Sequence, residues 1–216
     1  MHTVRFNTNT LVPSKVICIG RNYVKHIYEL NNEIPSSMVV FNKPNSAISN
    51  TLSFISDETR FEGEICFLMM EGTIAGIAFG LDLTKADIQN HLKAKGLPWE
   101  RAKGFDGSAV LGKFIPLDAP LESLRMTLHI NGILTQEATF SLMIYKPLEM
   151  VKEIQSFMTV EDGDVIMSGT PKGVATYKIG DEFVGRIYSD NRLLVESSWN
   201  VKAKIHDIPL KEFYGL

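Results

Sequence analysis

The amino-acid sequence predicts a domain of mixed α/β structure that is rich in β-strands and carries a few helices. Its 216 residues, 44% of them hydrophobic, are enough to bury one full core. Short apolar runs bounded by Gly, Pro and Asn recur along most of the chain, as is typical of strands joined by turns. Because neither an internal repeat nor a long linker divides the sequence, we expect one domain over residues 1–216, with residues 1–45 as a candidate N-terminal cap.

The first half of the chain is predicted to alternate between strands and helices. Tyr23, Ile27 and Leu30 stand at helical spacing and predict a helix over residues 21–32. A second helix is expected from Thr84 to Lys95, because the acidic residue three positions after Thr84 resembles a capping box. Strands are predicted at four apolar runs, over residues 15–20, 38–44, 60–70 and 73–83.

The second half is predicted to consist mainly of strands and turns. Asn131-Gly132, within "HINGIL", is a strong signal for a two-residue β-hairpin turn. One further helix is expected over residues 147–157, where "PLEMVKEIQSF" spaces its apolar side chains for a helix.

Composition and charge exclude several classes of protein. A formal net charge of -3 provides no basic field that could wrap nucleic acid. The first 20 residues lack the pattern of a secretory signal, and the apolar runs are too short to span a bilayer. Cys18 and Cys66 sit among Ile, Val and Phe, which favours buried thiols over a disulfide. We therefore expect a soluble cytoplasmic protein.

Two glutamates stand one residue apart in the apolar segment "RFEGEICFLMM", residues 60–70. With the two-residue period of a strand, Glu62 and Glu64 share one face, where their charges repel each other. Asp82 ends the next strand, so strand pairing would bring all three carboxylates together. Three oxygen ligands favour a hard ion such as Mg²⁺, with Mn²⁺ or Ca²⁺ as alternatives. The competing interpretation is a solvent-facing edge strand that uses charge to prevent aggregation.

His26 and Glu29 are three residues apart on the first predicted helix, so their side chains share a face. A carboxylate beside an imidazole raises its basicity and fixes its tautomer, as a general base acting on water requires. A solvated surface pair is the alternative, and Lys25 with Glu29 could form an ordinary helical ion pair. Lys103, in "ERAKGFDG", precedes a glycine-containing turn, and this pattern alone predicts a solvated loop lysine.

The segment "MSGTPKGV", residues 167–174, follows an apolar run and contains two glycines and a proline. It is not a Walker A phosphate loop, because it lacks the G-x-x-x-x-G-K-[ST] spacing. Its backbone N–H groups and threonine hydroxyl could nevertheless hold a substrate carboxylate. A tight turn between strands is the alternative.

Taken in order along the chain, six segments resemble the fumarylacetoacetate hydrolase family, in its acylpyruvase-like and oxaloacetate-decarboxylase-like branch. The resemblance runs from about residue 14 to the C-terminus and rests on "ICIGRNYVKHIYE", "VVFNKPNSAI", "RFEGEICFLM", "GLDLTKADIQ", "LPWERAKGFDGSAVLGKFIP" and "MSGTPKGV". It implies a β-roll or β-sandwich with a few peripheral helices, a bound Mg²⁺ or Mn²⁺, and a homodimer.

The resemblance also implies roles for nine residues. They are the metal ligands Glu62, Glu64 and Asp82, the catalytic residues His26, Glu29 and Lys103, and the ligand-lining residues Arg21, Gln89 and Thr170. One position departs from the family pattern, because Ala86 stands where many members have an arginine that helps to fix the substrate. The adjacent Lys85 points about 100° away on a helix and need not compensate.

The activity expected from this resemblance is metal-dependent cleavage of a C–C bond in a 2,4-dioxo acid of the acylpyruvate or fumarylpyruvate type. The reaction would pass through a pyruvate enolate stabilised by the ion and by Lys103. We favour hydrolysis, with His26 and Glu29 activating water, because simple decarboxylation needs no such pair. Decarboxylation or tautomerisation of oxaloacetate at the same site is the alternative, and a non-catalytic protein that binds metal and oxo acids is a third.

Overall fold

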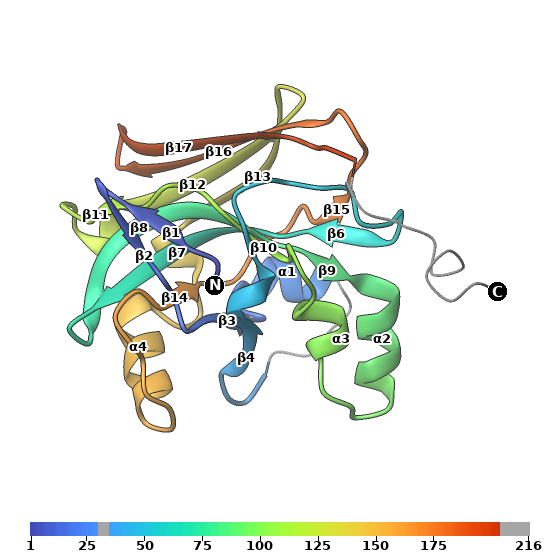
Figure 1. The fold of residues 1–216 in the computed structure, drawn as a ribbon, viewed down its shortest axis with the longest axis horizontal. Coiled ribbons are helices and arrows are strands. Elements are labelled where there is room, and N and C mark those ends of the chain that lie inside the picture. The colour runs from blue at the N-terminus through green and yellow to red at the C-terminus, as the bar shows by residue number, and fades with distance from the viewer. Residues whose placement is uncertain (30–34, 204–216) are drawn as a thin grey trace.

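The computed structural model describes residues 1–29 and 35–203, except for the side chains of Lys25, His26 and Tyr28. Two packed sheets form its centre, and in Figure 1 the smaller one lies above the long strands of the larger. The smaller sheet has the strand order β13 (Ile133–Thr139), β12 (Leu124–Ile130), β16 (Glu182–Ser189) and β17 (Arg192–Asn200). This arrangement confirms the predicted mixed, strand-rich fold.

The larger sheet contains eight strands and supplies the framework of the candidate site. Its order is β4 (Val39–Pro44), β3 (Lys15–Gly20), β14 (Val165–Met167), β7 (Gly63–Met70), β8 (Thr73–Asp82), β10 (Ala109–Leu111) and β5 (Ile48–Ser49), and β11 (Ile115–Pro116) also pairs with β8. The predicted strands over residues 15–20, 38–44 and 73–83 are therefore confirmed, and the run at 60–70 is split into two strands.

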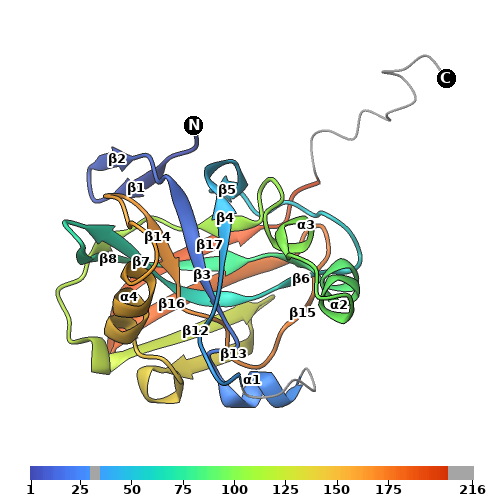
Figure 2. The same cartoon turned by 90° about the horizontal axis from the view of Figure 1, so that it is seen from below.

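Short elements complete the fold. A three-stranded sheet joins β15 (Ala175–Thr176), β6 (Thr59–Phe61) and β9 (Thr84–Lys85), and β1 (Val4–Phe6) pairs with β2 (Asn9–Leu11). The helices are α1 (Val24–Glu29), α2 (Ala86–Ala94), α3 (Glu100–Lys103) and α4 (Pro147–Gln155), with 3-10 turns at Asn45–Ala47, Leu121–Ser123 and Phe140–Leu142. Figure 2 shows α4 and the α2–α3 pair on opposite flanks of the larger sheet. No helix in the described part of the chain is long and apolar enough to cross a membrane.

Strand β7 is buried on both faces. Ile65 and Phe67 belong to the core between the two sheets, which also contains Phe183 from β16. Cys66 and Leu68 point the other way and join a second apolar cluster. Burial on both sides is expected for a central strand, and it fixes the register because a slip of one residue would exchange the two faces. Cys18 and Cys66 are both buried free thiols, as predicted.

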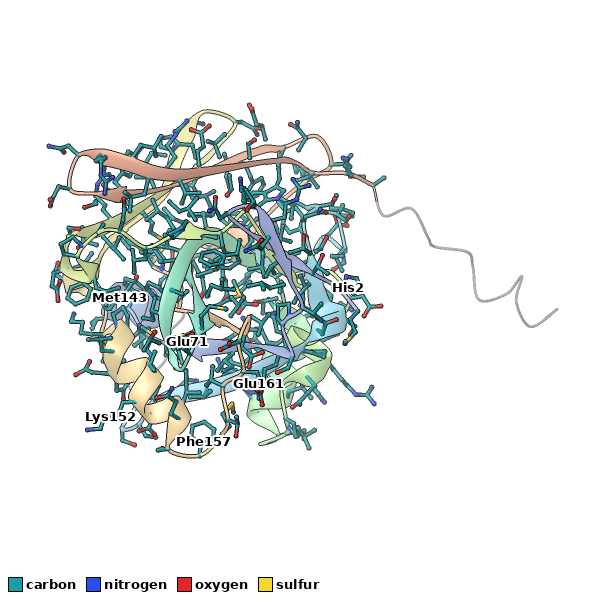
Figure 3. All side chains as sticks on the ribbon, turned by 60° about the vertical axis from the view of Figure 1, so that its left-hand side comes forward. His2, Glu71, Met143, Lys152, Phe157 and Glu161 are labelled. Atoms are coloured by element: carbon teal, nitrogen blue, oxygen red, sulfur yellow. The ribbon has the colours of Figure 1, made fainter. Side chains whose placement is uncertain are left out.

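The turn between β7 and β8 packs beside the loop that follows α4, where Figure 3 labels Glu71 and Glu161. The N–H of Glu71 donates to Asp162 Oδ1 at 2.6 Å, and Gln155 Nε2 donates to the Gly72 carbonyl at 2.9 Å. Both turn residues have positive φ angles, as a tight hairpin requires.

Three helix predictions need correction, and one of the three lies partly outside the described residues. Helix α1 begins at Val24, three residues later than predicted. Helix α2 begins at Ala86 and not at Thr84, because Thr84 and Lys85 pair with β6 as a strand. Tertiary pairing overrides the capping signal here, and Thr84 does not cap the helix. Helix α4 ends at Gln155, two residues earlier than predicted. The predicted end of the first helix falls within residues 30–34, which are not described.

Candidate metal centre

The carboxylates of Glu62, Glu64 and Asp82 converge. Each offers an oxygen, and these oxygens all lie within 4.8 Å of one another. Strands β7 and β8 pair antiparallel, and the N–H of Asp82 donates to the Glu62 carbonyl at 2.9 Å, so the register itself brings the three residues together. Glu64 is 2% exposed and Asp82 1%. The alternative of a solvent-facing edge strand is therefore wrong.

The electrostatics of Glu64 favour binding of a cation. Burial raises the pKa of Glu64 well above its ordinary value, and the negative charges of Asp82 and Glu62 raise it further. The N–H of Gly169 donates to Glu64 Oε2 at 2.7 Å and compensates only in part. Since the three side chains offer only oxygen donors, the set suits a hard divalent ion such as Mg²⁺ or Mn²⁺.

Lys103 ends helix α3 and is 3% exposed. Its Nζ donates to Asp82 Oδ2 at 2.8 Å, to Glu62 Oε2 at 2.9 Å and to Thr84 Oγ1 at 2.6 Å. Burial by itself would lower the pKa of Lys103, but the charges of Asp82 and Glu62 outweigh burial and hold the pKa above its ordinary value. The side chain therefore stays an ammonium ion, and the expectation of a solvated loop lysine was wrong.

A second buried lysine, which the sequence analysis did not single out, lies on the other side of Asp82. Lys43 is fully buried in β4, and its Nζ lies 2.8 Å from Asp82 Oδ1. It also donates to the backbone carbonyl of Lys103. The sequence feature that could have indicated its burial is its position at the end of an apolar strand, directly before Pro44. Asp82 thus contacts one ammonium group through each of its oxygens.

A cavity of about 40 Å³ opens onto the acidic triad. Arg21, Gln89 and Thr170, which the family resemblance places at the ligand site, all line it. Five further lining residues were not predicted, and they include Lys93 from α2, Trp99 from the turn before α3 and Phe41 from β4. The cavity therefore combines carboxylates, cations and an aromatic wall in a space suited to a small polar ligand.

Gln136 on β13 of the smaller sheet links the site to the second layer and was also missed. Its Oε1 accepts from the N–H of Gly63 at 2.9 Å, and its Nε2 donates to Thr170 Oγ1 at 2.9 Å and to the Pro171 carbonyl at 3.0 Å. The Thr170 hydroxyl in turn donates to the Gly63 carbonyl at 3.0 Å. A Cβ on Gly63 would lie 2.8 Å from Gln136 Oε1, so only glycine fits between the two glutamates.

The predicted His26–Glu29 pair is described only in part. The backbone of both residues lies in α1, but the His26 side chain lies outside the described residues. The Glu29 carboxylate accepts from the N–H of Gly173 at 3.0 and 3.1 Å. The glycine-rich turn over residues 167–174 thus directs backbone N–H groups at two protein carboxylates, those of Glu64 and Glu29.

Comparison with known proteins agrees with this fold. A crystal structure of fumarylpyruvate hydrolase from Pseudomonas aeruginosa in complex with Mn²⁺ and pyruvate has a TM-score of 0.84 at 26% identity, covering 94% of this chain and 96% of that one. A solved structure from Oleispira antarctica has a TM-score of 0.87 at 33% identity and covers 93% of this chain and 100% of its own. The fold is therefore shared with a hydrolase whose crystal structure contains Mn²⁺ and pyruvate.

The chain belongs to the fumarylacetoacetate hydrolase family, since residues 15–209 match the family described as "Fumarylacetoacetate (FAA) hydrolase C-terminal". Among its relatives, oxaloacetate tautomerase YcgM of Escherichia coli is 35% identical over 188 residues, which are 78% of this chain and 86% of that protein. The mitochondrial oxaloacetate tautomerase FAHD1 of Bos taurus is 35% identical over 191 residues, covering 80% of this chain and 86% of its own.

Proposed function

We propose that this protein is a divalent-metal-dependent enzyme that interconverts the keto and enol forms of oxaloacetate. The main observation in support of this proposal is the small cavity that is lined by the acidic triad together with Lys103, Arg21 and Lys93. Such a space fits a short, charged oxo acid better than a long apolar tail. The relatives named oxaloacetate tautomerase support this choice over the hydrolysis that the sequence favoured.

Glu62, Glu64 and Asp82 are the residues that would hold the ion. When bound, the ion would supply a Lewis acid for the keto oxygen and the neighbouring carboxylate of the substrate. Lys103 adds a fixed positive charge beside the triad, which favours negative charge that develops on the keto oxygen. Trp99 and Phe41 form apolar walls of the cavity.

Tautomerisation moves one proton from C3 to the keto oxygen and leaves the atoms of oxaloacetate otherwise unchanged. His26 is our candidate for removing the C3 proton, with Glu29 orienting it. Glu29 is held at the glycine-rich turn by the N–H of Gly173, which places this carboxylate beside the turn that also contains Thr170. A positioned base of this kind contributes roughly 10²–10⁴-fold to a rate.

The test follows the ultraviolet absorbance of enol-oxaloacetate as it relaxes to the keto form. The Mg²⁺- or Mn²⁺-loaded protein should accelerate this relaxation, and treatment with EDTA or the substitution Asp82→Asn should return it to the buffer rate. Relaxation at the buffer rate with the loaded wild-type protein would refute the proposal and would favour a non-catalytic binder of oxo acids.

A second candidate is hydrolysis of acylpyruvates, which the likeness to a fumarylpyruvate hydrolase supports. Here His26 with Glu29 would deprotonate water for attack on C4, and cleavage would release a carboxylic acid and enolpyruvate. Acetylpyruvate and fumarylpyruvate should then be consumed, and His26→Ala should abolish this cleavage while it spares much of any oxaloacetate decarboxylation. Equal loss of both activities would contradict that division of roles. The homodimer and the cytoplasmic location stay predictions, which light scattering and cell fractionation can test.

A further inference from the structure

One face of helix α2 forms part of the cavity wall. Gln89 and Lys93 both line the cavity, four residues apart on this helix. Ala86 lies seven residues before Lys93, which on an α-helix places the two within about 20° of each other around the axis. Because Ala86 carries no charge, Lys93 is the residue through which this face of α2 brings a positive charge to the cavity.

A second cation reaches the same space from a different element. Arg21 follows strand β3 and also lines the cavity. Its φ angle is +57°, a conformation that non-glycine residues rarely adopt and that is frequent at functional sites. The two cations influence each other, since burial lowers the pKa of Lys93 and the positive charge of Arg21 lowers it further. Two like charges that line one cavity favour the binding of an anion there.

The charged residues of the cavity lining fall into two sets by their proposed role. The acidic triad and Lys103 would bind an ion and the 2-oxo carboxylate of a substrate. Arg21 and Lys93 are the two cations of the lining that this role does not use. The six charged lining residues cancel formally, three carboxylates against three cations, and the buried Lys43 adds one more positive charge beside Asp82. A bound dication therefore leaves the site with a net positive charge. This charge matches a dianion better than a monoanion.

We infer that Lys93, together with Arg21, binds the second carboxylate of a dicarboxylic 2-oxo acid and thereby selects such acids over monocarboxylic ones. The inference rests on the proposed function, because it assumes that the ion held by the acidic triad binds the 2-oxo carboxylate. It adds a specificity-determining residue to that site. In this chain the substrate-binding cation on α2 would be Lys93, because position 86 is an alanine.

The experiment compares two stable ligands that the proposed reaction does not consume. They are 2-oxoglutarate and 2-oxopentanoate, which share a five-carbon 2-oxo acid skeleton and differ in the terminal carboxylate. Binding to the Mn²⁺-loaded protein is measured by calorimetry at fixed salt for the wild type, Lys93→Met, Lys93→Arg and Lys95→Met. Lys95 is the matched control, because it is an exposed lysine at the end of the same helix and does not line the cavity.

The wild type should bind the dicarboxylate at least about tenfold more tightly than the monocarboxylate, as expected for a charge-assisted contact. Lys93→Met should reduce this ratio to below about threefold, whereas Lys93→Arg and Lys95→Met should retain it. Mn²⁺ affinity should stay within about twofold in all four proteins, since Lys93 is not a proposed ligand. The inference would be overturned if Lys93→Met kept the wild-type ratio of dicarboxylate to monocarboxylate affinity. It would also be overturned if Lys95→Met reduced that ratio as much as Lys93→Met does. Neither ligand is turned over, so this binding experiment is independent of catalysis. An absence of tautomerase activity would refute the proposed function but would leave the outcome of the binding experiment open.

Discussion

The substitution Gln136→Leu tests whether the second sheet holds the acidic strand in place. Leucine has a similar volume but forms none of the hydrogen bonds of the amide, so the buried N–H of Gly63 and the carbonyl of Pro171 lose their bond to Gln136. Each buried polar group left unpaired costs about 1–3 kcal/mol, which gives a total of about 2–6 kcal/mol. For a domain of this length, that loss lowers Tm by at least about 4 °C.

The assay is thermal unfolding of the metal-free protein, followed by Mn²⁺ titration. Gln155→Leu is the matched control, because its single hydrogen bond to the exposed turn at Gly72 can be replaced by water. Its effect should stay within about 0.5 kcal/mol. Gln136→Leu should also weaken Mn²⁺ binding, since Gly63 lies between two proposed ligands. Equal Tm values for the two variants would show that the amide network does not position the site.

Three further predictions concern the buried charges. Lys103→Met at saturating Mn²⁺ should lower kcat for tautomerisation roughly 10²–10³-fold, and a wild-type kcat would refute its electrostatic role. Lys43→Met removes one of the two ammonium partners of Asp82 and should destabilise the protein by about 3–5 kcal/mol in urea unfolding, so an unchanged midpoint would contradict the importance of this ion pair. Because burial and neighbouring carboxylates raise the pKa of Glu64, a metal ion must displace its proton, and Mn²⁺ affinity should rise with pH until that raised pKa is passed. Affinity that does not change with pH would contradict this coupling.

The acidic triad could be predicted from the sequence because its placement depends on local rules. A two-residue period put Glu62 and Glu64 on one side, and a tight turn made β7 and β8 neighbours, which brought Asp82 alongside. The predicted hairpin at Asn131-Gly132 succeeded for the same reason, and both of its residues have positive φ angles.

The remainder of the site depends on contacts between distant segments, for which the sequence carries no local signal. Gln136 lies 73 positions from Gly63, and Lys43 lies 60 positions from the carbonyl of Lys103 that it contacts. Lys103 was expected in solvent because its neighbours are typical of a turn. Its burial is compensated by two carboxylates more than 20 positions away, those of Asp82 at the end of β8 and of Glu62 between β6 and β7. Pairing with β6 likewise overrode the capping signal at Thr84.

The three carboxylates are not equivalent, and this difference leads to a final prediction. Asp82 contacts two lysines and Glu62 contacts Lys103 and Thr84, whereas the hydrogen bond to Glu64 comes from the N–H of Gly169. Glu64 therefore has the least compensated charge, and a bound dication would stabilise it most.

Glu64→Gln should consequently act in opposite directions on stability and on metal binding. The amide oxygen can still accept the hydrogen bond from Gly169, and the amide is neutral beside Asp82 and Glu62 without having to bind a proton, so Tm of the metal-free protein should rise. The raised pKa fixes the sign of the pH dependence. Folded Glu64 keeps its proton where the unfolded carboxyl has lost it, so the metal-free wild type loses stability as pH rises above the ordinary value of 4.5, and the gain from the substitution should grow over that range. Mn²⁺ affinity should fall further in Glu64→Gln than in Glu62→Gln. A lower metal-free Tm for Glu64→Gln at neutral pH would mean that the buried charge is already compensated, and that the triad has no need of an ion.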